Sequence, residues 1–87
     1  MARLTVIADD LTGALDTGVQ FANRCVSVRV AAVYGTAAVH EELFQADVAV
    51  IDAEVRHRSQ QEAYKICLEL VQQALRCGTD SVYIKTD

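Results

Sequence analysis

The hydrophobic residues of the chain are concentrated in four short runs. They read LTVIA at 4–8, VSVRVAAV at 26–33, VAVI at 48–51 and SVYI at 81–84, and each is rich in β-branched residues and bounded by polar or small ones. Runs of this length and composition are typical of buried strands. We therefore predict four strands.

Between these runs, apolar residues recur at the spacing of one helix face. Two intervals show this pattern: Leu15, Val19 and Ala22 within 12–24, and Val39, Leu43 and Ala46 within 37–46. A stripe of this kind is typical of an amphipathic helix that covers a core. Both intervals predict helices.

The clearest helix is predicted over 60–77. Ser59 and Glu62 fit the capping box S-x-x-E, and Gly78 is a natural C-terminal cap. A continuous apolar stripe lies between them: Ala63, Ile66, Cys67, Leu70, Val71, Ala74 and Leu75.

Strands and helices thus alternate in the order βαβαβαβ, which predicts an α/β fold: a three-layer arrangement with a parallel sheet between helices. Right-handed crossovers place the carboxyl ends of all strands at one edge. No proline, repeat or low-complexity tract divides residues 1–87, so we expect one domain. The chain stops at Asp87, directly after the fourth strand, which suggests part of a longer protein.

Composition narrows the function classes. The 87 residues are 52% hydrophobic and 23% charged with a net charge of −4, which is typical of a soluble globular domain. They contain no basic stripe, which argues against nucleic acid as a partner. The apolar run at the N-terminus is broken by acids, so neither a signal peptide nor a membrane partner is expected. The three cysteines lack metal-site spacing and indicate reduced core thiols in a cytoplasmic protein.

Three polar clusters follow predicted strands: Asp9 and Asp10, the stretch 52–57, and Lys85 to Asp87. In open parallel sheets, ligands bind beyond the carboxyl ends of the strands. We therefore expect these clusters to converge on one site.

The aspartate pair allows two interpretations. Asp10 or Thr12 can cap the helix that begins near Gly13. Two acids exceed what a cap requires, and the second carboxylate could bind a sugar hydroxyl, accept a proton or hold Mg²⁺ through water.

The basic residues of the other clusters also leave two interpretations open. Arg56, His57 and Arg58 precede a helix N-terminus, where an anionic ligand would relieve their repulsion with the helix dipole, or they form a solvated loop. Lys85 can hold a phosphate or a carboxylate, or lie on the rim. His40 is expected in solvent, and the roles of Asp16 and Glu54 stay open.

The order of acids and lysine also describes a phosphoacceptor receiver domain, in which Asp52 would be phosphorylated and Asp9, Asp10 and Lys85 would hold the metal and phosphate. The count of strands differs, because receiver domains place that lysine after a fifth strand. Receiver domains also lack a Thr-Gly turn directly after the acids. This interpretation is the alternative to the one that follows.

Three motifs resemble the four-carbon acid sugar kinase family, whose members phosphorylate threonate, erythronate or 3-oxo-tetronate. The family's N-terminal signature is similar to VIADDLTGALDTGVQFA in this chain. Its stretch with Ser-Arg-His before a helix is similar to VIDAEVRHRSQQEA. The start of its Lys-Lys-Thr-Asp-Ser-Thr-Leu-Arg-Gly motif is similar to YIKTD. The motifs occur in the family's order and span nearly the whole chain. Val55 stands where the family usually has serine, and Ile84 where it often has the first lysine.

The resemblance implies an incomplete N-terminal sugar-acid-binding domain of an ATP-dependent kinase. The C-terminal nucleotide-binding domain, which would bind ATP and Mg²⁺, is absent from this chain, so the chain alone is expected to be inactive. An inactive remnant is a third interpretation. No metal site is expected within the 87 residues, the partner is a small-molecule sugar acid, and the oligomeric state stays open, a homo-oligomer included.

Residue by residue, the family's motifs match a set of substrate-binding candidates: Asp9, Asp10, Arg56, His57, Lys85 and Asp87. We expect Arg56, with His57 or Lys85, to pair with the substrate carboxylate. Asp9 or Asp10 is then the candidate catalytic residue, which would orient the attacking hydroxyl.

Overall fold

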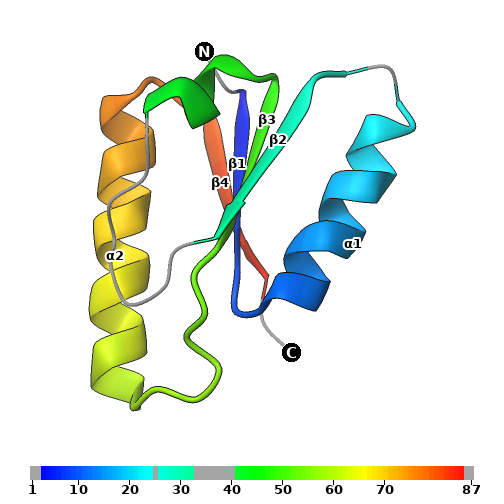
Figure 1. Ribbon diagram of the computed structural model, residues 1–87. Helices are drawn as coiled ribbons and strands as arrows, with labels where there is room; N and C mark the ends of the chain where they lie inside the picture. The colour runs from blue at the N-terminus through cyan, green and yellow to red at the C-terminus, as the bar shows by residue number, and fades with distance from the viewer. Residues whose placement is uncertain (1–2, 25, 33–40, 86–87) are drawn as a thin grey trace.

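The computed structural model describes residues 3–24, 26–32 and 41–85. Its strands form one parallel sheet in the order β2-β3-β1-β4: β1 (Leu4–Ala8), β2 (Val28–Ala32), β3 (Val48–Asp52) and β4 (Ser81–Lys85). Helix α1 (Leu11–Ala22) and helix α2 (Gln60–Arg76) lie on opposite sides of the sheet (Figure 1). The predicted three-layer α/β fold with a parallel sheet is therefore confirmed.

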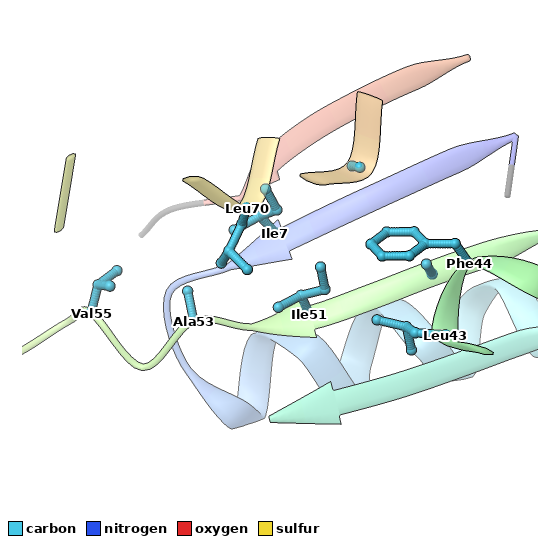
Figure 2. Close-up of a cluster of buried hydrophobic side chains, with 9 residues drawn as sticks. Ile7, Leu43, Phe44, Ile51, Ala53, Val55 and Leu70 are labelled. Carbon is cyan, nitrogen blue, oxygen red and sulfur yellow. The ribbon is translucent and has the colours of Figure 1, made fainter. Parts of the chain in front are cut away.

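The two central strands, β1 and β3, carry the core on both faces. Their side chains alternate, so Ile7 and Ile51 face α2 whereas Val6 and Val50 face α1. Figure 2 shows the α2 side, where Ile7 and Ile51 lie near Leu70 of α2. Burial from both sides explains why these two segments read as unbroken apolar runs.

The prediction that all four strands are buried is wrong for the outer two. Most residues of β2 and β4 are exposed, and Tyr83 and Ile84 keep 58% and 48% of their surface. A helix about 10 Å wide covers roughly two strands at their 4.8 Å spacing. One helix per face therefore protects the middle of the sheet and leaves its edges open.

Helix α1 lies close to the sheet because small residues face it. Ala14 and Gly18 are its buried residues. A Cβ added at Gly18 would lie 3.0 Å from Cγ2 of Val30 on β2, so the neighbour would have to shift by a few tenths of an ångström. The glycine at this position therefore sets how near α1 approaches the sheet.

The predicted caps of α2 are present. The Ser59 hydroxyl accepts a hydrogen bond from the Glu62 N–H at 3.2 Å and donates one to the Glu62 carboxylate at 3.1 Å. Beyond the C-terminus, Gly78 has φ 89°, the left-handed conformation that glycine favours. Within the described ranges, no helix is long and apolar enough to cross a membrane.

The interval 37–46, over which a helix is predicted, is described only from Glu41 onward. Its described part is a five-residue 3₁₀-helix, η1 (Glu41–Gln45), while Val39 and His40 lie outside the described residues. Asp47 fixes the chain directly after η1, because its N–H donates to the Ser27 hydroxyl at 2.8 Å and its carboxylate accepts from the Ser27 N–H at 3.1 Å. This anchor leads straight into β3 and ends the helical segment.

Candidate functional site

The carboxyl ends of β1, β3 and β4 are held together by backbone hydrogen bonds. The N–H of Ala53 donates to the carbonyl of Ala8 at 2.9 Å, and that of Val55 donates to the carbonyl of Asp9 at 3.1 Å. The N–H of Asp9 in turn donates to the carbonyl of Lys85 at 3.3 Å. Asp9 thus joins the turn after β1 to both neighbouring segments, and the predicted polar clusters meet at one edge of the sheet.

An ion pair connects the first two clusters. Nη1 of Arg56 lies 2.7 Å from Oδ2 of Asp10, and the exposed fractions of the two side chains are 46% and 17%. The other carboxylate oxygen of Asp10 accepts a hydrogen bond from the Gly13 N–H at 2.8 Å, which makes Asp10 the N-cap of α1. Both oxygens of Asp10 are therefore engaged, one by the helix and one by the guanidinium.

The third cluster contributes Lys85, which lies against the first turn of α1. A Cβ added at Gly13 would lie 3.7 Å from Cε of Lys85 and 3.1 Å from Oδ1 of Asp10. The lysine stem and the capping carboxylate therefore approach the same point of the helix. With Arg56, this gives the site two cations beside the N-terminus of a helix, where anions are favoured.

The two acids of the pair face different surroundings. The negative charge of Asp9 raises the pKa of the Cys67 thiol on α2, in addition to the larger effect of burial. The charge of Asp9 thus acts on α2, whereas Asp10 lies at the start of α1. Within the described ranges, no hydrogen bond or ion pair engages the Asp9 carboxylate.

Asp52 ends β3 and is fully buried, with 0% of its surface exposed. Its Oδ1 accepts a hydrogen bond from the Glu54 N–H at 3.0 Å, and Glu54 adopts a left-handed φ of 51°. Burial raises the pKa of Asp52 to about 6; the neighbouring Glu54 and Asp10 carboxylates raise it too, while the Glu54 N–H opposes the shift. A carboxyl in this state changes charge near neutral pH.

The remaining candidates have no described contact with this cluster or lie outside the described residues. His57 is exposed on the loop before α2. Arg58 pairs with Glu62 at 3.4 Å within its own helix start. Asp87 lies outside the described residues. Val55, at the position where a serine was expected, is 7% exposed and packs in the core (Figure 2).

Sequence reasoning considered Asp52 only as a phosphoacceptor and did not count it among the sugar-acid residues. The sequence did carry a signal for Asp52, because this acid directly continues the apolar run 48–51. Aspartate side chains are almost never fully buried unless they are paired. The receiver interpretation finds no support, since the carboxylate that would take the phosphoryl group is enclosed.

The described residues offer no ready magnesium site. They contain no group of three or more His, Cys, Asp or Glu side chains that could hold a metal ion. We therefore assign no step of a reaction in this chain to Mg²⁺ or to ATP.

A pocket of about 400 Å³ lies at the opposite end of the sheet, lined by Arg3, Arg24 and Asp47 among others. It is at the amino ends of the strands, whereas ligands of open parallel sheets bind beyond the carboxyl ends. We give more weight to the carboxyl edge, because three segments distant in the sequence bring charged side chains together there.

Comparison with known proteins gives one match. Residues 4–87 match the family model described as a sugar-binding N-terminal domain. No curated protein and no solved structure matches the chain. The match spans the strands, both helices and all three polar clusters, and the chain therefore belongs to the family of sugar-binding N-terminal domains.

Proposed function

We propose that the chain binds a four-carbon sugar acid at the carboxyl edge of its sheet, as the substrate-binding part of an ATP-dependent kinase. The family match supports sugar binding, since this domain type is the N-terminal domain of four-carbon acid sugar kinases. The observation that carries the acid specificity is the ion pair between Arg56 and Asp10.

This ion pair supports the proposal, because Arg56 is placed where it can pair with a carboxylate. Arg56 is 46% exposed on its side chain, so a ligand carboxylate can approach the guanidinium beside its pair with Asp10. Lys85, beside the first turn of α1, supplies a second positive charge for the same anion. Asp10 holds Arg56 in place and is a positioning residue.

Asp9 is the acid that remains available for the substrate's hydroxyls. Its backbone is fixed by hydrogen bonds to Val55 and Lys85, while its carboxylate has no partner within the described ranges. A fixed carboxylate of this kind can accept a hydrogen bond from a hydroxyl and orient it for phosphoryl transfer. In this proposal ATP and Mg²⁺ are bound by a nucleotide-binding domain outside residues 4–87.

Calorimetric titration of the chain with threonate and erythronate tests the proposal. A hydrogen-bonded charge pair contributes about 1.5–3 kcal/mol, so Arg56→Gln should weaken binding by roughly 10- to 100-fold. Arg58→Gln is the matched control, because Arg58 is two residues away and pairs with Glu62 instead. The control should bind within about twofold of the unaltered chain, as exposed ion pairs contribute little.

Two results would overturn the proposal. One is that the folded chain binds neither acid. The other is that the Arg56 and Arg58 variants lose affinity equally, which would indicate only a general attraction of the anion to basic residues. ATP hydrolysis or kinase activity by the 87-residue chain would contradict the assignment of ATP to another domain.

A further inference from the structure

The proposed function makes no use of the pocket at the amino ends of the strands. Its volume is about 400 Å³, within the range of about 300–1,000 Å³ that is typical of small-molecule sites. It lies where α1 ends and β1 and β3 begin, at the end of the molecule opposite Asp10 (Figure 1). The five residues of β1 separate the two ends by roughly 16 Å. A small ligand in this pocket would therefore not reach the sugar-acid site.

The walls of the pocket are largely apolar. The hydrophobic residues that line it are Leu4, Phe21, Val26 and Val48. Val48 belongs to the buried cluster on the α1 side of the sheet, and Leu4 and Phe21 pack against that cluster. This wall is thus held in place by the core. An apolar group that entered the pocket would remove hydrophobic surface from water.

Two arginines line the same pocket. Within the described residues, the guanidinium groups of Arg3 and Arg24 take part in no hydrogen bond or salt bridge. Their backbones are nevertheless fixed, because the Arg3 N–H donates to the Asp47 carbonyl at 3.0 Å and the Arg24 N–H donates to the Phe21 carbonyl at 3.0 Å. Both cations are therefore anchored beside the apolar wall and available to an anion.

Asp47 is the acidic residue of the lining, and the fold already uses its carboxylate. That carboxylate accepts a hydrogen bond from the Ser27 N–H at 3.1 Å. Hydrogen bonds from Ser27, and to a smaller extent the charge of Arg3, lower the pKa of Asp47, so it is ionised at neutral pH. Two cations and one anion leave a single positive charge on the described lining, which a ligand with one negative charge would balance.

We propose that this pocket binds a small monocarboxylate with an apolar body, at a site separate from that of the sugar acid. The ligand carboxylate pairs with Arg24 and Arg3, and its apolar body packs against Phe21 and Val48. Arginine suits this role because its planar group donates two parallel hydrogen bonds to a carboxylate. A polyhydroxy acid does not suit the pocket, since the apolar walls offer its hydroxyls no partners.

An NMR titration of the isotopically labelled chain tests the inference. The probe is 3-phenylpropanoate, which carries one carboxylate and an aromatic body. Its amide, 3-phenylpropanamide, has the same shape without the charge, and threonate has the charge without the apolar body. The same titrations on Arg24→Gln measure the contribution of the cation, and Arg58→Gln is the matched control because Arg58 pairs with Glu62 at the other end of the molecule.

We expect 3-phenylpropanoate to bind saturably and to shift the backbone signals of Leu4, Val26 and Val48, while those of Asp10 and Arg56 stay in place. The amide should bind about tenfold more weakly, because it loses the charge-assisted hydrogen bonds. Arg24→Gln should weaken binding of the acid by about five- to tenfold for the same reason, whereas Arg58→Gln should leave it within about twofold.

Several results would overturn the inference. They are an absence of saturable shifts around the pocket, equal affinity for the acid and its amide, and equal affinity of the Arg24 and Arg58 variants. Threonate that binds in the pocket as tightly as 3-phenylpropanoate would also overturn it, because the apolar walls would then contribute nothing. If Arg24→Gln does not fold, Arg3→Gln takes its place with the same expectation. A negative result leaves the proposed function intact, since that function is tested through threonate and Arg56→Gln.

Discussion

Asp10 has two separable structural contributions, and substitutions can divide them. Its Oδ1 caps α1 through the Gly13 N–H, and its Oδ2 pairs with Arg56 at 2.7 Å. Asp10→Asn keeps a capping oxygen and removes the charge, because asparagine caps helices about as well as aspartate. Asp10→Ala removes both contributions.

The expected magnitudes follow from the exposure of the pair. Loss of a cap costs about 1 kcal/mol. The side chains of Arg56 and Asp10 are 46% and 17% exposed, so solvent screens the pair and limits it to about 1 kcal/mol, the upper end for surface ion pairs. We therefore expect Asp10→Asn to lose about 1 kcal/mol of unfolding free energy and Asp10→Ala about 2 kcal/mol.

Urea unfolding followed by circular dichroism measures both losses. With a slope of about 1 kcal/mol per molar urea for a small domain, the midpoints should fall by about 1 M and 2 M. A double-mutant cycle of Asp10→Asn with Arg56→Gln should give a coupling of about 0.5–1 kcal/mol that shrinks in high salt. The exposed pair of Arg58 and Glu62, at 3.4 Å, is the matched control, with a coupling of about 0.3 kcal/mol.

Two outcomes would refute this reasoning. If Asp10→Ala is no less stable than Asp10→Asn, the hydrogen bond to the Gly13 N–H does not stabilise α1. If the effects of Asp10→Asn and Arg56→Gln are simply additive, the short contact between them carries no energy, and Arg56 would have to be positioned by other contacts.

Three further predictions concern stability. The pKa of Asp52 is about 6 in the folded chain and its ordinary value is near 4, so between these pH values the folded state holds a proton that the unfolded state has lost. Asp52 should therefore lower the free energy of unfolding by at most about 3 kcal/mol as pH rises from about 4 to 6. Asp52→Asn should flatten that decline in urea unfolding, and an unchanged pH profile would contradict it. Thr79→Val should lower the free energy of unfolding by about 1–3 kcal/mol, because the buried Thr5 hydroxyl, which donates to Thr79 at 3.0 Å, loses its acceptor. Thr5→Val should lower it by about 1 kcal/mol, because the Thr79 hydroxyl still donates to the Ser81 carbonyl. Equal losses in thermal unfolding would contradict this difference. Gly18→Leu should lower the free energy of unfolding by about 1–3 kcal/mol, because the larger side chain pushes α1 away from Val30. Gly18→Ala should be nearly neutral, because the gain in helix propensity offsets the tight contact. A Gly18→Leu variant as stable as the unaltered chain would mean that α1 moves without penalty.

The features that could be predicted from the sequence are those set by neighbouring residues. The capping box of Ser59 and Glu62 and the glycine after α2 lie within a few residues of the groups they satisfy, and both were placed correctly. The parallel sheet also followed, because alternating strands and helices leave little choice of architecture. Local hydrogen bonds and a strict alternation are visible in a single sequence.

The features that could not be predicted depend on which strands become neighbours. The apolar runs of β2 and β4 resemble those of β1 and β3, yet only the central pair is buried, because the strand order decides which runs receive two neighbours. The same order brings Arg56 to Asp10, 46 positions apart in the sequence, and encloses Asp52. Composition and periodicity carry no information about such pairings.

The division of the sheet into central and edge strands also bears on how the site moves. Asp10 and Arg56 follow β1 and β3, and Asp52 ends β3; each of these strands has a partner on both sides, while Lys85 ends β4, whose one partner among the described residues is β1. Hydrogen exchange should therefore be slower along β1 and β3 than along β4. Local opening of β4 should therefore move Lys85 away from α1 while the ion pair between Asp10 and Arg56, beside the two central strands, stays in place.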